Sequence, residues 1–573
     1  MCGILGGNNP NWNYKEGIEC MRHRGPDGIR ISCMPKFTLA FARLAIMDLS
    51  EQGMQPMFSQ DNQVGIVFNG EIYGYHKLRD SLITKGYQFR STSDTEVVLN
   101  AYLEWGDRFI QQVDGMFGMA VYDKREGTVK LFRDRIGIKP LYYYYDGNNF
   151  GFSSELKGIL NMCTSVSWEI DYTAVYDYMN YCCIPDPKTY YKNVYKLQPA
   201  HRMVFDVKTG KIIKNSSYWR LKVNEWQGAQ RNQSDLIEEL RYLIQESVKE
   251  QMIADVPVGT FLSGGVDSSI ITYEGNRINP HLETFSMGFD KARYNELQYA
   301  RELAERFDIH MNARVFQPDI FKEYYSRIKT WYDEPFADTS AFPTHIVSRM
   351  AKEKVTVVLT GDGGDEVFGG YSRQARIWQK EKEGGPDHLL MTMAYLKYKK
   401  WTKKDNTRDY FWMDDLTFLL GSMGRPLVMS DRDLRRRFGI DKDYDACWAY
   451  RKHYFKNLPP MTRVQYLDLK TYLPWDILTK VDRASMAVSL ETRVPFLSRK
   501  IVEFAFALSE EDRCPNGEKK GLLKKAYAKE LGRKFLYRPK QGFTMPDYYF
   551  SNEKSQQEHI YDELWAKETV KIW

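Results

Sequence analysis

The sequence lacks the patterns that mark exported or membrane-bound proteins. Its eight cysteines include no CxxC pair and no cluster with histidine at zinc-ligand spacing, so neither a disulfide framework nor a structural zinc site is expected. No basic segment followed by an apolar core opens the chain, and no apolar run approaches the ~20 residues that span a bilayer. We therefore expect a cytoplasmic protein with no membrane partner.

The chain also lacks a strong excess of either charge. Lysine and arginine number 81 against 75 aspartate and glutamate residues, and the small excess is spread along the chain, so nucleic acid is not expected as a partner. Hydrophobic residues make up 43% of the 573, which is usual for a globular protein. Because this length exceeds what one hydrophobic core supports, two large domains are expected. The oligomeric state stays open, with a homodimer as one option.

Two patterns of secondary structure divide the chain. Residues 1–206 contain short apolar or alternating runs separated by Gly, Asn and Asp, which are typical of a sheet-rich α+β domain. Residues 207–232 turn polar and lose periodicity, as expected for a surface hairpin and a linker. In residues 233–573 strand and helix signals alternate and then become mainly helical. This pattern predicts a parallel sheet covered by helices, with ligands at the carboxyl ends of its strands.

A glycine-rich segment, Ser263-Gly-Gly-Val-Asp-Ser-Ser269, lies between an apolar strand signal and the start of a helix. Its glycines let the backbone approach a ligand, its amides can form an anion-binding nest, and a helix N-terminus favours the same charge. The segment has no Walker A lysine, so Asp267 is expected to hold Mg²⁺. A capped turn without a ligand is the alternative. The predicted phosphate site consists of Ser263, Gly264, Gly265, Asp267, Ser268 and Ser269.

A second acidic, glycine-rich segment, Thr360-Gly-Asp-Gly-Gly-Asp-Glu366, follows a predicted strand at residues 355–359. Two such loops on one parallel sheet can meet over one ligand. Carboxylates repel a triphosphate, so Asp365 is expected to act through Mg²⁺. A solvated acidic turn is the alternative interpretation.

Together these segments resemble a known superfamily. Ser263–Ser269 looks like the pyrophosphate loop of the ATP-pyrophosphatases, which adenylate a carboxylate, and the segment LTGDGGDEVFGGY at 359–371 resembles the second loop of asparagine synthetases. The segments at 478–486, 491–497 and 538–543 also look like this family. The resemblance implies that Lys540 neutralises charge as the acyl-adenylate forms. It further implies nucleotide contacts from Leu262, Met287, Thr360 and Gly361, and Mg²⁺ ligation by Asp267 and Asp365.

The first residues, Met1-Cys2-Gly3-Ile4, indicate an N-terminal nucleophile. Removal of Met1 would leave Cys2 first, and its α-amine, with an unperturbed pKa of about 7.7 to 8.0, can act as a base beside the thiol. The segments at 22–27, 42–48, 69–73 and 93–96 resemble class II glutamine amidotransferases in the expected order. These enzymes are N-terminal-nucleophile hydrolases.

This second resemblance implies a glutamine site. Arg43 can pair with the α-carboxylate of glutamine and Asp94 with its α-ammonium, helped by the segment from Asn69 through Gly70 to Glu71. The Asn69 side chain and the Gly70 backbone N–H can stabilise the oxyanion formed when Cys2 attacks the side-chain amide, at roughly 3 kcal/mol for each contact.

The two resemblances cover nearly the whole chain and match the glutamine-hydrolysing asparagine synthetases. The expected fold is an α+β N-terminal-nucleophile hydrolase domain, an αββα sandwich, followed by an α/β parallel-sheet ATP-pyrophosphatase domain with a mainly helical C-terminal part. The expected reaction converts glutamine, ATP, aspartate and water to glutamate, asparagine, AMP and pyrophosphate. Ammonia is expected to move between the two sites through an internal passage.

Two positions depart from the family pattern. Asp362, expected in the catalytic set, stands where many asparagine synthetases carry glutamate, and Ser498 stands where aspartate is common. These departures leave open the amidation of another carboxylate, such as a uronic acid of a surface polysaccharide or a peptide precursor. A nucleotide-sensing relative without turnover is a further alternative, which the presence of Cys2, Asp267, Asp365 and Lys540 in one sequence disfavours.

Overall fold

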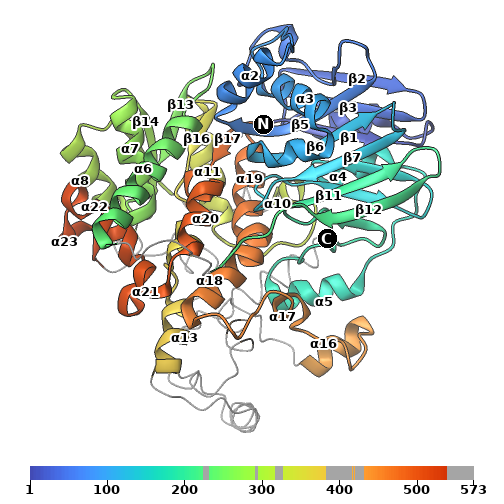
Figure 1. Ribbon diagram of the computed structural model, residues 1–573. Coiled ribbons are helices and arrows are strands. Elements are labelled where there is room, and N and C mark those ends of the chain that lie inside the picture. The colour runs from blue at the N-terminus through green and yellow to red at the C-terminus, as the bar shows by residue number, and fades with distance from the viewer. Residues whose placement is uncertain are drawn as a thin grey trace.

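Three β-sheets organise the described part of the chain (Figure 1). Two six-stranded antiparallel sheets lie in the N-terminal part and one five-stranded parallel sheet lies in the C-terminal part. The computed structural model describes residues 1–223, 232–290, 295–316, 327–382, 416, 419 and 431–538.

The two antiparallel sheets have the strand orders β10-β8-β9-β1-β3-β2 and β12-β11-β7-β6-β5-β4. The bounds of the first set are β1 (Gly3–Gly7), β2 (Gly28–Met34), β3 (Phe37–Arg43), β8 (Tyr142–Tyr145), β9 (Phe150–Ser153) and β10 (Val194–Lys196). The bounds of the second set are β4 (Met57–Phe58), β5 (Val64–Tyr73), β6 (Asp114–Asp123), β7 (Thr128–Arg133), β11 (His201–Asp206) and β12 (Lys211–Ser217).

Helices cover the outer face of each antiparallel sheet. Apolar side chains such as Ile4, Phe41, Val67 and Leu131 fill the space between the two sheets, as the alternating strand patterns require. The first sheet packs against α1 (Tyr14–Glu19) and α4 (Leu156–Met162), and the second packs against α2 (Tyr75–Thr84) and α3 (Asp94–Trp105). This arrangement confirms the predicted αββα sandwich.

The parallel sheet has the order β15-β14-β13-β16-β17. Neighbouring strands β13 and β16 pair Thr260 with Leu359, so the loops that follow them begin side by side. Helices on both sides of the sheet alternate with its strands, as the sequence predicts. The strands are β13 (Val258–Phe261), β14 (Glu283–Gly288), β15 (Met311–Val315), β16 (Val357–Leu359) and β17 (Glu491–Arg493), and the helices between them include α7 (Val266–Ile278), α8 (Leu297–Phe307), α10 (Ile328–Tyr332), α11 (Ala341–Lys352) and α12 (Gly364–Phe368).

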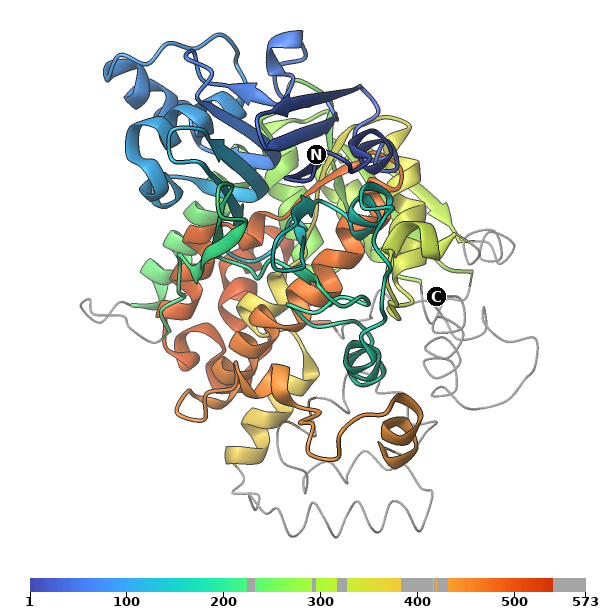
Figure 2. The ribbon, with the colours of Figure 1, turned by 90° about the vertical axis from the view of Figure 1, so that its right-hand side faces the viewer.

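The remaining regular elements of the described chain are helices. Figure 2 shows the last of these helices, after residue 431, in orange and red, below the blue strands of the sandwich. Among the described residues, none of the helices combines the length and the apolar character that a bilayer span requires. The remaining bounds are α5 (Tyr172–Tyr181), α6 (Gln233–Gln251), α13 (Ser372–Lys382), α16 (Asp431–Phe438), α17 (Trp448–Arg451), α18 (Pro460–Lys470), α19 (Leu478–Met486), α20 (Arg499–Ala507), α21 (Glu510–Arg513), α22 (Gly521–Leu531) and α23 (Arg533–Leu536).

Strand β17, at the edge of the parallel sheet, is covered by the sandwich. The Lys139 Nζ of the sandwich donates to the Thr492 carbonyl at 3.3 Å, and Arg493 Nη2 lies 3.4 Å from Glu71 Oε1. All three residues of β17 are buried, and Figure 1 shows the strand beside the N-terminus. The outer edge of the parallel sheet therefore forms part of the contact between the two parts of the chain.

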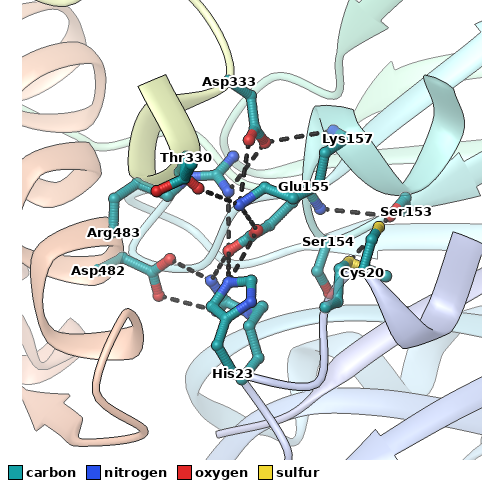
Figure 3. A network of polar contacts seen from close by, with 12 residues as sticks. Cys20, His23, Ser153, Ser154, Glu155, Lys157, Thr330, Asp333, Asp482 and Arg483 are labelled. Carbon is teal, nitrogen blue, oxygen red and sulfur yellow. Dashed lines mark hydrogen bonds and ion pairs between the residues drawn. The ribbon is translucent and has the colours of Figure 1, made fainter. Parts of the chain in front are cut away.

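A second contact between the two parts is a network of buried charges (Figure 3). Arg24 Nη1 lies 2.8 Å from both Glu155 Oε1 and Asp482 Oδ2, and Lys157 Nζ lies 3.1 Å from Asp333 Oδ1. Buried charges are costly unless they are paired, so these ion pairs favour one relative placement of the two parts. The network joins Arg24, Glu155 and Lys157 of the sandwich to Asp333, Asp482 and Arg483 of the helical and parallel-sheet part.

Candidate active sites

Cys2 lies immediately before β1, in the core between the two antiparallel sheets. Its backbone N–H donates to Asn69 Oδ1 at 3.0 Å, and the Leu44 N–H donates to its sulfur at 3.4 Å. Burial raises the pKa of the Cys2 thiol above its ordinary value. A nearby base is therefore required to generate the thiolate near neutral pH.

The predicted glutamine-binding residues gather around Cys2. Strand β3 pairs Ala42 with Gly3, which brings Arg43 beside Cys2, and the Arg43 guanidinium donates to the Ser50 carbonyl at 2.8 Å. Asp94 begins α3, and its Oδ2 accepts the N–H of Ile72 in β5 at 2.9 Å. This bond ties the first turn of α3 to the strand that carries Asn69, Gly70 and Glu71.

Asn69 has one bonded and one unbonded side-chain amide atom next to Cys2. Its Oδ1 accepts the Cys2 N–H, whereas its buried Nδ2 has no hydrogen-bond partner among the described residues. A buried donor without a partner is costly, so a ligand oxygen at this position would satisfy it. A Cβ at the following residue, Gly70, would overlap the Met116 carbonyl, which explains the glycine there.

The two glycine-rich loops meet at a cavity of about 610 Å³. The first loop leads from β13 into α7 and the second from β16 into α12, so both lie at the carboxyl ends of parallel strands. Two of the predicted residues do not line the cavity. Gly264, with φ +86°, packs against α8, and Ser269 is buried within α7. The predicted residues that do are Leu262, Ser263, Gly265, Asp267, Ser268, Met287, Thr360, Gly361, Asp362 and Asp365.

Glycine allows the second loop to lie close to the first. A Cβ at Gly361 would overlap the backbone of Asp267 and Ser268, and a Cβ at Gly364 would overlap the Asp267 carboxylate. The spacing of the acidic and glycine residues therefore brings the two carboxylates, Asp267 and Asp365, to one place.

Lys520, which sequence analysis missed, lies between these two carboxylates. Its Nζ contacts Asp267 Oδ2 and lies 2.6 Å from Asp365 Oδ1. Burial would lower the pKa of Lys520, but the two carboxylates raise it above its ordinary value, so the amine stays charged. Lys520 directly precedes α22, more than 150 residues from either loop in the sequence, and only the fold reveals its position.

The cavity lining carries further charges. Lys480 Nζ lies 2.9 Å from Asp338 Oδ2, and both residues line the cavity. Asp362 accepts a hydrogen bond from the Thr360 hydroxyl at 2.7 Å, and burial raises the pKa of Asp362. Lys480 belongs to a segment that resembles the asparagine synthetases, but nothing in that resemblance singled it out.

Lys540, the predicted catalytic lysine, lies outside the described residues. Arg538, two positions earlier, lines the cavity and its Nη2 donates to the Gly264 carbonyl. The segment that carries the predicted lysine therefore reaches the first glycine-rich loop at Arg538.

The sandwich with Cys2 and the parallel sheet with two glycine-rich loops define a glutamine amidotransferase with an ATP-dependent ligase part. A family model described as a glutamine amidotransferase domain matches residues 1–219, and one described as asparagine synthase matches residues 239–571. The chain belongs to the asparagine synthase family.

Named relatives agree with this assignment. Asparagine synthetase [glutamine-hydrolyzing] 1 of Bacillus subtilis is 32% identical, over 97% of this chain and 89% of the relative. Putative asparagine synthetase [glutamine-hydrolyzing] 2 of Methanocaldococcus jannaschii is 40% identical, over 62% of this chain and 71% of the relative. A putative asparagine synthetase [glutamine-hydrolyzing] of Mycobacterium bovis is 32% identical, over 92% of this chain and 83% of the relative.

Proposed function

We propose that the chain makes asparagine, with glutamine as nitrogen donor. ATP and aspartate give aspartyl-AMP and pyrophosphate in the C-terminal part, and glutamine and water give glutamate and ammonia in the sandwich. Ammonia then displaces AMP from the adenylate. The proposal is supported most by the fact that the parallel sheet borders both sites. Its edge strand β17 contacts residues around Cys2, and the neighbouring strand β16 leads into the nucleotide cavity.

In the glutamine site, the Cys2 thiol attacks the side-chain amide and the Cys2 α-amine takes its proton. Asn69 Nδ2 and the Gly70 N–H stabilise the oxyanion, and the free position of Asn69 Nδ2 supports this role. Ammonia leaves, and water hydrolyses the remaining thioester to glutamate. Arg43 binds the α-carboxylate of glutamine and Asp94 binds its α-ammonium.

The affinity for glutamine should depend on the ionisation of Asp94. Burial raises the pKa of this carboxyl to about 6, so Asp94 is neutral below that pH and loses its charge pairing with the substrate ammonium. We expect the KM for glutamine to rise as the pH falls below 6, towards about tenfold for each unit. Glutaminase kinetics between pH 5 and 8 test this, and a KM that stays constant over the range contradicts it.

The nucleotide site fits Mg²⁺. Asp267 and Asp365 would hold the ion, because carboxylate oxygens are the donors that Mg²⁺ prefers and the metal commonly binds one or two carboxylates together with substrate phosphates. The position of Lys520 supports this proposal, since a positive charge already pairs with both carboxylates. When bound, Mg²⁺ supplies charge compensation for the phosphates of ATP. Lys520, which pairs with the same two carboxylates, adds a second positive charge.

Aspartate is the proposed acceptor. An amino-acid acceptor needs a cation for its α-carboxylate and an anion for its α-ammonium, and the cavity wall offers both in Lys480 and Asp338. Asp362 lies on the same wall, where it would face the carboxylate that is adenylated.

Pyrophosphate release measured over a panel of carboxylic acids identifies the acceptor. With ATP and ammonium present, we expect aspartate to stimulate release at least about tenfold more than glutamate, a uronic acid or a short peptide. A uronic acid lacks an α-ammonium for Asp338, and the side-chain carboxylate of glutamate is one methylene further from its α-carbon than that of aspartate. Stimulation by a uronic acid or a peptide instead would assign a different acceptor. Failure of every acid to stimulate release would contradict a ligase.

A further inference from the structure

Residues around the start of β13 reach the sandwich beside the glutamine site. The Asp255 N–H donates to the Ile46 carbonyl at 2.9 Å, and Asp255 Oδ2 accepts the Asp48 N–H at 2.8 Å. The neighbouring apolar side chains pack against the core between the two antiparallel sheets, and they are Ala254, Val256 and Val258. Two hydrogen bonds from one residue of the C-terminal part therefore fix the loop that follows β3.

Asp48 has a backbone conformation that needs such support. Its φ is +52°, in the left-handed region that residues other than glycine rarely adopt. The Asp48 carboxylate is already occupied, because it accepts the Ser50 N–H at 3.1 Å and the Thr92 N–H at 2.8 Å. Of the hydrogen bonds that hold this turn, the one from Asp255 comes from the other part of the chain.

The turn orients Arg43, which binds the α-carboxylate of glutamine in the proposed function. The Arg43 guanidinium donates through Nη2 to the Asp48 carbonyl, and through Nη1 to the Ser50 carbonyl at 2.8 Å. These bonds use two of its five N–H donors, so the others remain for a ligand. Arg43 is buried and carbonyl oxygens, rather than a carboxylate, hold it, so its charge stays available to the substrate.

We propose that Asp255 is a positioning residue for the glutamine site, which fixes the turn at Asp48 and through it the direction of Arg43. Asp255 acts through hydrogen bonds alone, and no covalent step is involved. The inference rests on the proposed function, because it takes Arg43 as the residue that binds glutamine. It adds that the sandwich binds glutamine well only while the C-terminal part is in place.

Asp255 is separate from the nucleotide cavity. It is not among the residues that line the cavity, and the whole of β13 lies between it and the first glycine-rich loop. Asp255 is also exposed, so truncation of its side chain leaves no enclosed cavity. A change of this side chain should therefore alter glutamine binding and leave the ATP site intact.

The variant Asp255→Ala tests the proposal, with glutamate release measured over a range of glutamine concentrations at saturating ATP and aspartate. The KM for glutamine should rise about tenfold while kcat changes by less than about twofold, because the Asp48 N–H loses a charged acceptor but Cys2 keeps its place. Asparagine formation from ammonium should be unchanged. An unchanged KM, or an equal loss of ammonium-dependent synthesis, overturns the proposal.

Two further variants at this position make the test specific. Asp255→Asn keeps an oxygen that can accept the Asp48 N–H, so its KM should return to within about threefold of the unsubstituted value. A KM as high as that of Asp255→Ala would overturn the proposal. If Asp255→Ala does not fold, Asp255→Ser, whose hydroxyl ends one bond short of the carboxylate oxygen, decides in the same way.

The variant Glu503→Ala is the matched control. Glu503 is another partly exposed carboxylate of the C-terminal part, and its Oε1 accepts an N–H from Trp219, which follows β12, at 2.8 Å. Its KM for glutamine should stay within about twofold of the unsubstituted value, because this bond is remote from Arg43. A rise equal to that of Asp255→Ala would assign the effect to a weakened contact between the two parts and overturn the proposal.

The unsubstituted protein separates this inference from the function on which it rests. If it releases no glutamate from glutamine, the proposed function fails and the role of Asp255 fails with it. An active protein whose KM for glutamine is unaffected by Asp255→Ala refutes the positioning role alone.

Discussion

Replacement of Cys2 by alanine should abolish amide formation from glutamine and leave amide formation from ammonium intact. The variant has no thiol to attack the glutamine side chain, so we expect glutamine-dependent synthesis to fall by at least about 10³-fold. Ammonium reaches the adenylate without Cys2, and the nucleotide cavity lies in the other part of the chain. Asparagine formation measured with each nitrogen source in turn provides the test.

Cys163→Ala is the matched control for this experiment. Cys163 is a buried cysteine of the same sandwich, and it lies in the core between α4 and the first sheet rather than beside Asn69. Both nitrogen sources should support synthesis in this variant. Equal loss of both activities in Cys2→Ala would argue against two separate sites.

Replacement of Lys520 by methionine should remove ATP-dependent activity. The substitution deletes the positive charge between Asp267 and Asp365 at nearly constant volume. We expect pyrophosphate release to fall by about 100-fold or more, because a fixed charge at the phosphates is lost. The two carboxylates also lose their buried partner, and we expect the free energy of unfolding without Mg²⁺ to fall by about 3–5 kcal/mol.

Two measurements separate these effects. Pyrophosphate release reports the loss of charge at the phosphates, and chemical denaturation with and without Mg²⁺ reports the loss of stability. The control is Lys529→Met, at an exposed position on the helix that follows Lys520. Glutamine hydrolysis should persist in Lys520→Met. A variant that loses stability but releases pyrophosphate at the normal rate would assign Lys520 a structural role only.

The parts of the molecule that the sequence predicts are those with local signals. The first glycine-rich loop was predictable because an apolar strand, two glycines and a helix start follow one another within residues 258–270, and the structure has this order. The segment at 69–71 and Asp94 were predicted through motifs, and the Asp94–Ile72 bond brings them together. The assignment of roles to these residues stays a prediction. So do the domain limits at 206 and 232, because part of the linker lies outside the described residues.

The missed residues owe their positions to contacts between distant segments. Lys480 reaches the cavity from α19 and Lys520 from the residue before α22, and neither segment carries a phosphate-binding pattern. Glu491 reaches Met1 across 490 positions. Strand β17 has three residues, too few to show the alternation that identifies a strand. Its pairing with β16, rather than its own composition, makes it a strand.

The burial of β17 affects how the chain can be divided. Within the whole chain, the sandwich covers the outer side of this strand, through Lys139 and Glu71 among other residues. A fragment that starts near residue 233 would leave that strand edge open to water, with backbone groups ready to pair with a second molecule. A separately expressed C-terminal fragment would therefore tend to self-associate through β17, unless a charged or proline substitution blocks the strand edge.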